Sequence, residues 1–231
     1  MLQSYIIYIY FYIFVPRIIT YMKFRTEITV QSSDFKISHT CKTAMHGSCF
    51  AENMASKFLN AGFSIDLNPF GIAYNPLSLS QNMNRLLDNK PYFADELFKD
   101  NDVYHSFSHH SRFSGIDPNE VLSGINSRIE QSSAFLQKAN LLIITFGTAY
   151  VYRLQSNGNV VSNCHKLPAK FFTYKRLTIE EIIREWNSLI VRLQTFNSSL
   201  RILFTVSPIR HWKDGAHENQ LSKSILLLSI D

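Results

Sequence analysis

The chain has 231 residues, enough for one substantial domain and short for two, since single domains commonly span roughly 100 to 200 residues. Hydrophobic residues make up 45% of the sequence and charged residues 18%, which excludes a largely disordered chain. The formal net charge is +5, but the lysines and arginines are scattered along the sequence, so we expect no nucleic-acid partner.

The first sixteen residues are uncharged and strongly apolar, but Pro16 and Arg17 interrupt them before the roughly 20 residues that a membrane-spanning helix needs. No basic segment precedes this run and no A-x-A cleavage pattern follows it. This apolar run has three interpretations: a membrane anchor, a weak signal peptide, or an extension translated from a wrong start codon. Because an ordinary soluble pattern begins at Met22, we favour an extension over residues 1–21 and a cytoplasmic location over export. Membrane contact is expected only if residues 1–16 act as an anchor.

The predicted elements begin with a short strand over residues 42–46, which ends at Gly47. From Ala51 the apolar residues recur at helical spacing, and Gly62 is placed to end that helix. The pattern therefore predicts a strand, a tight turn and a helix.

A second strand is predicted over residues 63–67, and Asn75 then caps a helix that has Pro76 at its first position. The segment from about residue 90 to residue 115 shows no periodicity and is rich in His, Phe and Ser. A loop of that length in a compact domain is either functional or wrapped over the core.

Asp117 and Pro118 mark the start of a third helix, because a carboxylate cap is followed by proline at the first helical position. Residues 141–146 form a continuous apolar run, which predicts a strand that is covered on both faces.

Thr178 and Glu181 form a capping box at the start of a long amphipathic helix. A further strand is predicted over residues 201–206 and a last helix over residues 219–230. Strands that alternate with helices pair in parallel, so we expect an α/β fold, a three-layer α/β/α sandwich with a mainly parallel sheet.

Ligands of such sheets bind outside the carboxyl ends of the strands. The segments that follow the predicted strands are residues 47–51, 68–71, 146–149 and 207–211, and we expect them to meet at one edge. Ser48 lies between a strand and a helix N-terminus, where free backbone N–H groups and the helix dipole stabilise a developing anion. It is a candidate nucleophile, although the commoner role of a serine in this place is an N-cap.

Residues 46–53, His-Gly-Ser-Cys-Phe-Ala-Glu-Asn, contain the motif after which the GSCFA family is named. The chain resembles that family, whose members look like SGNH-type serine hydrolases. The similarity covers nearly everything after Met22, in blocks at residues 67–76, 105–112, 146–152, 163–169 and 207–212. The resemblance implies a fold similar to SGNH and flavodoxin-like proteins, and one domain over residues 22–231 that is incomplete at its C-terminus.

The resemblance also implies hydrolysis of a small-molecule or carbohydrate ester, with Ser48 attacking the carbonyl carbon. Gly71 and the backbone N–H groups of Ser48 and Cys49 would resemble the oxyanion donors of the family. Cys49 is itself an alternative nucleophile, because a helix N-terminus favours the thiolate, or else a small buried apolar residue.

The third sequence block of SGNH enzymes has a glycine followed two residues later by an asparagine that donates to the oxyanion. This chain has Gly147-Thr148-Ala149 at that position, so the asparagine is absent. Thr148, Asn75 or Asn163 would have to replace it.

SGNH-like enzymes take their base from an Asp-x-x-His block that follows a further strand near the C-terminus. The two Asp-x-x-His matches in this sequence, Asp102 to His105 and Asp214 to His217, are not preceded by such a further strand, so we expect the family's block to be missing. Because a serine without a base is a weak nucleophile, we expect a truncated product that is inactive in hydrolysis. His211 is the best replacement base because it follows a strand end, against a structural hydrogen-bonding role. Arg210 either binds an anionic substrate group or pairs with surface acids. The alternative function is a non-catalytic module that holds a glycan or an acylated ligand in the same cleft.

His105 and His109 would share one face of a helix, a spacing that suits zinc. Their segment has the pattern of a loop, however, and no carboxylate completes a ligand set. We therefore expect no metal and no other cofactor. Three cysteines lack the spacing of a zinc site or a disulfide framework.

Overall fold

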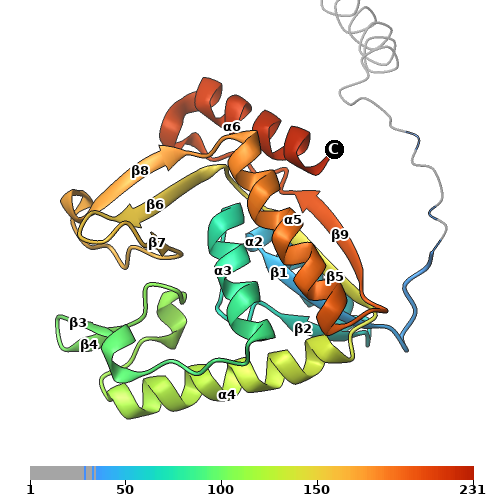
Figure 1. Ribbon diagram of the computed structural model, residues 1–231, viewed down its shortest axis with the longest axis horizontal. Helices are drawn as coiled ribbons and strands as arrows, with labels where there is room; N and C mark the ends of the chain where they lie inside the picture. The colour runs from blue at the N-terminus through green and yellow to red at the C-terminus, as the bar shows by residue number, and fades with distance from the viewer. Residues whose placement is uncertain (1–28, 30–32, 34) are drawn as a thin grey trace, which may run out of the picture. The chain divides into compact units, whose positions relative to one another are not determined.

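The computed structural model describes residues 29, 33 and 35–231, and the expected extension over residues 1–21 lies outside them (Figure 1). The folded unit extends over residues 37–231. Within the described part of the chain, no helix is both long and apolar enough to span a bilayer.

The helices and strands of this unit follow one another in the order β1 (Lys42–Gly47), α2 (Cys49–Asn60), β2 (Ser64–Leu67), α3 (Pro76–Leu87), β3 (Phe98–Asp100), β4 (Val103–His105), α4 (Pro118–Gln137), β5 (Leu141–Phe146), β6 (Tyr150–Leu154), β7 (Val160–Val161), β8 (Phe172–Arg176), α5 (Ile179–Phe196), β9 (Arg201–Val206) and α6 (Gly215–Ile230). Short 3₁₀ helices lie at Ala94–Glu96, Ser111–Phe113, Ala169–Phe171 and Trp212–Asp214.

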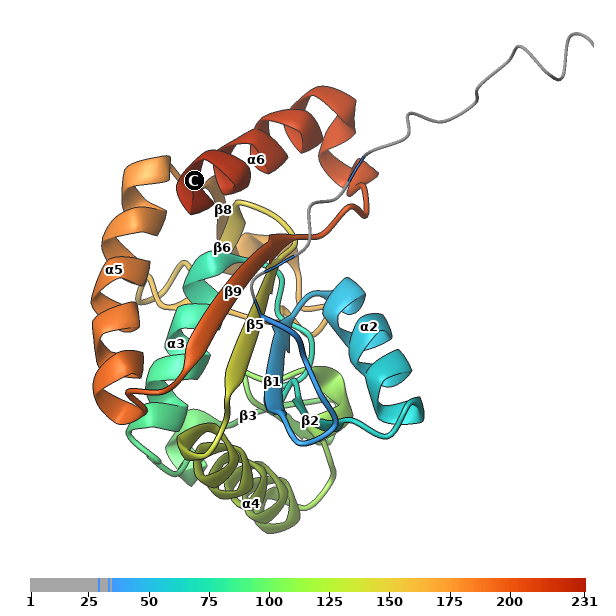
Figure 2. The same ribbon diagram turned by 90° about the vertical axis from the view of Figure 1, so that its right-hand side faces the viewer.

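The central sheet has the strand order β2-β1-β5-β9, and all of its neighbouring strands are parallel. Figure 2 shows α3 and α5 on one side of this sheet and α2 on the other. The predicted α/β class and the mainly parallel sheet with helices on both faces are confirmed. The predicted burial of β5 on both faces is also confirmed, since all six of its residues are buried.

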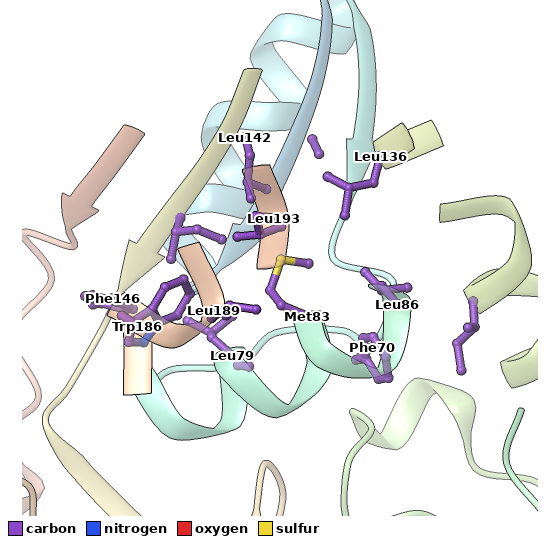
Figure 3. Packing of buried hydrophobic residues seen from close by; sticks show 14 of the residues in the cluster. Phe70, Leu79, Met83, Leu86, Leu136, Leu142, Phe146, Trp186, Leu189 and Leu193 are labelled. Atoms are coloured by element: carbon purple, nitrogen blue, oxygen red, sulfur yellow. The ribbon is translucent and has the colours of Figure 1, made fainter. Parts of the chain in front are cut away.

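The main hydrophobic core lies between the sheet and the helices α3, α4 and α5 (Figure 3). Phe146 at the end of β5 packs edge-on against Trp186 of α5, with 5.2 Å between the ring centroids. The indole N–H of Trp186 donates to the carbonyl oxygen of Pro76 at 3.2 Å. Burial of each large apolar side chain stabilises the fold by roughly 1.5–3 kcal/mol. This contact therefore fixes α5 and the start of α3 against the carboxyl end of β5.

Two small antiparallel sheets were missed by the sequence analysis. One has the order β7-β6-β8, and the other is the pair β3-β4 inside the expected loop of residues 90–115. Their strands have two to five residues, too few for a period-2 pattern to stand out. The loop is thus wrapped over the core, one of the two possibilities that its length allowed.

The last residue of β1 lies unusually close to β5. Gly47 has a φ of +145°, and a Cβ built on it would lie 2.2 Å from the carbonyl oxygen of Thr145. Any side chain at residue 47 would therefore push β1 away from β5 at the point where the chain turns into α2.

We expect Gly47→Ala to lower the free energy of unfolding by about 3 kcal/mol or more, because it adds both a clash and backbone strain. Gly124→Ala is the matched control, since Gly124 lies in α4 and a Cβ there meets nothing within 4 Å. That control should raise stability by about 0.5–1 kcal/mol. Urea unfolding of the two variants measures both effects, and equal stabilities would show that the close approach at residue 47 is not formed.

Candidate active site

The loops after β1, β2, β5 and β9 meet at the carboxyl edge of the sheet. The amide of Ser48 donates to the carbonyl oxygen of Thr145 at 3.2 Å, and the amide of Gly147 donates to that of Tyr74 at 2.7 Å. The amide of Ser207 donates back to the end of β5 at 2.8 Å. These backbone bonds hold the segments from four distant parts of the sequence together.

Ser48 is fully buried, and its Oγ has no hydrogen-bond partner among the described residues. It is the N-cap residue of α2, but its side chain makes no capping hydrogen bond. A buried hydroxyl without a partner costs about 1–3 kcal/mol. A simple N-cap role therefore does not account for a serine in this place.

Gly147 and Tyr74 lie against Ser48. A Cβ built on Gly147 would be 3.3 Å from the Cβ of Ser48 and 3.1 Å from Cδ1 of Tyr74. Both side chains thus converge on the same side of Gly147, and a side chain at residue 147 would require these neighbours to shift slightly.

The amide groups expected to bind an oxyanion differ in their availability. The amide of Ser48 is bonded to β5, and that of Gly71 donates to the carbonyl oxygen of Asn68 at 2.8 Å. A role in oxyanion binding would require those bonds to be exchanged. The amide of Cys49, at the first position of α2, has no acceptor in the described part of the chain. Its thiol is half-buried and free.

The side chains expected to replace the absent asparagine already make other hydrogen bonds. Asn75 caps α3, as predicted, through a 2.9 Å bond from a backbone N–H. Oγ1 of Thr148 lies 3.2 Å from Oγ of Ser222, and Asn163 donates to Oγ of Ser111 at 3.2 Å. None of them is free to meet an oxyanion without rearrangement.

A cavity of about 540 Å³ opens at this edge, and Asn75, Thr148, Asn163 and His211 contribute to its lining. Its aromatic lining comes from Tyr74, Tyr150, Tyr152, Phe172 and Tyr174. Ser48 is not part of the lining. Tyr74 both borders the cavity and lies against Gly147, the residue that Ser48 also contacts.

His211 is half-buried, and its Nε2 has no hydrogen-bond partner among the described residues. Its ring stands edge-on to Tyr74, with 5.6 Å between the centroids. Burial, and then the charge of Lys223, lower the pKa of His211 below 6.5, although Asp214 acts in the opposite direction. The imidazole is therefore neutral at pH 7, the form that a general base needs. Because Nε2 and the Oγ of Ser48 are both unpartnered, no hydrogen bond joins them.

Tyrosines of the small sheet β7-β6-β8 hold the segment that carries His211. The hydroxyl of Tyr174 donates to Oδ2 of Asp214 at 2.7 Å, and the hydroxyl of Tyr150 donates to the carboxylate of Glu218. These bonds fix the start of α6 beside the cavity. They engage phenol groups that would otherwise face a ligand.

Arg210 is exposed, and its guanidinium lies 5.8 Å from the ring centre of Trp212. It forms no ion pair with a carboxylate in the described part of the chain, and it does not line the cavity. The structure therefore places Arg210 outside the cavity, although it is the neighbour of His211 in the sequence.

Two residues that shape this edge, Asn68 and Lys223, are not among the site residues predicted from the sequence. Asn68 accepts the amide of Gly47 at 2.8 Å through Oδ1, while its buried Nδ2 has no partner among the described residues. Lys223 of α6 donates to the carbonyl oxygens of Gly147 at 2.6 Å and Ser207 at 2.7 Å. Asn68 begins a loop that contains Pro69 and Gly71, and this pattern indicates weakly that the residue has a structural role. A single lysine in a helix, such as Lys223, carries no such indication.

In the histidine-rich segment of residues 105–110, His109 is part of the packed interior. His109 is 1% exposed, and its Nδ1 lies 2.9 Å from Oγ of Ser106. Its ring packs against those of Phe70 and Tyr92, each at 4.9 Å between centroids. Among the described residues, no group of three or more histidines, cysteines and carboxylates is placed to hold a metal ion.

Burial, and then the charges of Arg85 and His165, lower the pKa of His109 to about 3. Between pH 6.5 and pH 3 the unfolded chain therefore binds a proton that the folded chain does not. The free energy of unfolding decreases as the pH is lowered through that window. We expect a loss of about 2 kcal/mol between about pH 6.5 and pH 5. His109→Gln should flatten this slope in urea unfolding, whereas His39→Gln, at an exposed position, should leave it unchanged. Equal slopes in both variants would contradict a neutral, buried His109.

A family model described as the GSCFA family matches residues 42–231. No curated protein and no solved structure matches the chain. The matched residues include every strand and helix of the folded unit, together with the turn at Ser48 and the loop that carries His211. The chain therefore belongs to the GSCFA family.

Proposed function

We propose that the chain carries the nucleophile site of an SGNH-like serine ester hydrolase, with Ser48 as the nucleophile. The observation that supports this proposal is the fully buried Ser48 hydroxyl, which has no partner among the described residues. It stands at the N-terminus of α2 on the carboxyl edge of a parallel sheet, where ligands of such sheets bind. The substrate would be an ester of a small molecule or a carbohydrate, held in the neighbouring cavity.

In the proposed reaction, Oγ of Ser48 forms a bond to the ester carbonyl carbon and its proton passes to Nε2 of His211. The electron pair of the C=O bond moves to the carbonyl oxygen. When the tetrahedral intermediate collapses, the C–O bond to the alcohol breaks and the alcohol leaves with the proton from His211. Water then hydrolyses the acyl ester of Ser48 by the same steps.

This chemistry requires a local opening, because Ser48 is fully buried and does not line the cavity. Tyr74, which borders the cavity and lies against Gly147 beside Ser48, is the side chain that we expect to move. His211 also has to approach Ser48, since the two groups share no hydrogen bond. Turnover should therefore be slow in this chain.

The second candidate is a non-catalytic module that binds a glycan or an acylated ligand in the same cavity. The absence of Ser48 from the lining of the cavity and the aromatic side chains in that lining favour it. This candidate predicts saturable binding of a ligand without release of product, whereas the hydrolase predicts a covalent acyl or phosphonyl adduct on Ser48.

A fluorophosphonate probe distinguishes the two. We expect the probe to form an adduct that maps to the peptide containing Ser48, and we expect Ser48→Ala to reduce labelling at least ~100-fold, because the attacking oxygen is removed. Intact-protein mass spectrometry and peptide mapping give the rate and the position.

Ser56→Ala is the matched control, because Ser56 lies on the same helix but is exposed, and its hydroxyl donates only to the carbonyl oxygen of Glu52. Labelling of the Ser56→Ala variant should equal that of the unsubstituted protein. If labelling persists unchanged in Ser48→Ala, or no adduct forms at any pH, the hydrolase proposal is wrong.

A further inference from the structure

Lys223 is the one described lysine whose amine reaches the ends of both β5 and β9. Its Nζ donates to the carbonyl oxygens of Gly147 and Ser207, at 2.6 and 2.7 Å. An ammonium group has three N–H donors, and no third acceptor is present among the described residues. One N–H donor of Lys223 therefore has no partner among the described residues.

The position of Gly147 brings this amine close to the candidate nucleophile. Gly147 lies against Ser48, so the carbonyl group that Lys223 binds belongs to the residue that packs on the Ser48 side chain. The amide of Ala149 donates to Oγ of the neighbouring Ser222 at 2.8 Å, which fixes this turn of α6 against the same loop. The lysine is thus held in place from two sides.

The electrostatic neighbours of Lys223 come from three other segments. Its charge lowers the pKa of His211, and it interacts favourably with an ionised Cys49. Asp214 faces His211, while Tyr74 lies near Cys49. Burial lowers the pKa of Lys223 itself to about 8, against the effect of Cys49, so the amine is mostly charged at pH 7 and mostly neutral at pH 9.

The third loop of this edge lacks the asparagine donor that SGNH enzymes place there, and the side chains of Asn75, Thr148 and Asn163 are engaged elsewhere. A positive charge is at least as effective as an amide for stabilising an oxyanion in a site from which water is excluded. The amine of Lys223, which belongs to α6, binds this same loop through the carbonyl oxygen of Gly147.

We propose that Lys223 donates its free N–H to the oxyanion that forms when Ser48 attacks the carbonyl carbon. This inference rests on the proposed function of Ser48. It assigns to a helix at the far end of the chain the role that the third loop does not fulfil. If Lys223 instead only tethered α6 to the strand ends, its protonation state would not govern the rate at which Ser48 reacts.

The first test does not depend on hydrolase activity. Cys49 adjoins Ser48, and its alkylation by anionic iodoacetate relative to neutral iodoacetamide reports the local charge. We expect Lys223→Met to lower this ratio of rate constants at least ~3-fold, while Lys223→Arg and the control Lys175→Met keep it. Lys175 is exposed and pairs with Glu181. Peptide mapping separates Cys49 from Cys41 and Cys164, and an unchanged ratio in Lys223→Met would overturn the inference.

The second test measures phosphonylation of Ser48 by the fluorophosphonate probe against pH. In the unsubstituted protein the rate should fall above about pH 8, as Lys223 loses its proton, and this readout needs no variant. Lys223→Met should slow labelling ~100-fold at pH 7, whereas Lys223→Arg should retain it within ~10-fold and remove the decline at high pH. A merely structural lysine would not move the pH profile.

The outcomes separate the two proposals. If Ser48 is labelled but all three proteins share one rate and one pH profile, the role of Lys223 is wrong and the nucleophile stands. If Ser48 is not labelled in the unsubstituted protein, the proposed function fails, and the role of Lys223 as an oxyanion donor fails with it. Circular dichroism of each variant shows whether a lost rate comes from a lost fold.

Discussion

The contact between the end of β1 and β5 determines the geometry of the whole carboxyl edge. Because residue 47 has no side chain, its Cα can lie where a Cβ would be 2.2 Å from the carbonyl oxygen of Thr145. The same carbonyl oxygen accepts the amide of Ser48. The chain therefore leaves the sheet and enters α2 with Ser48 held against the neighbouring strand, fully buried, and its hydroxyl free of protein partners in the described region.

Loops from distant parts of the sequence contribute further side chains to this edge of the sheet. The loop after β2 supplies Tyr74, whose carbonyl oxygen binds the amides of Gly147 and the residue after it. The segment after β9 supplies His211, and α6 returns to place Lys223 on the ends of two strands. An unpaired hydroxyl, a neutral imidazole and an ammonium group consequently lie on the segments that meet at one edge of the sheet. That combination is costly for stability alone, which is why we interpret it as a reaction site.

The sequence predicts those features that depend on local chemistry. The apolar run of β5, the cap at Asn75 and the capping box at Thr178 each follow from a few adjacent residues, and all are confirmed. The strand–turn–helix around Ser48 is confirmed as well. Lys223 could not be predicted, since its role depends on where α6 crosses the sheet. The two small antiparallel sheets escaped prediction because their strands are short and are stabilised by tertiary contacts.

A crystal structure of the protein after reaction with a fluorophosphonate would test the central claim most directly, because it would show the adduct and its surroundings together. The account predicts a phosphonyl group bonded to Oγ of Ser48, with the ring of Tyr74 displaced and a phosphonyl oxygen within hydrogen-bonding distance of Nζ of Lys223. An adduct on another residue, or a phosphonyl oxygen directed away from the loop at Gly147, would contradict it.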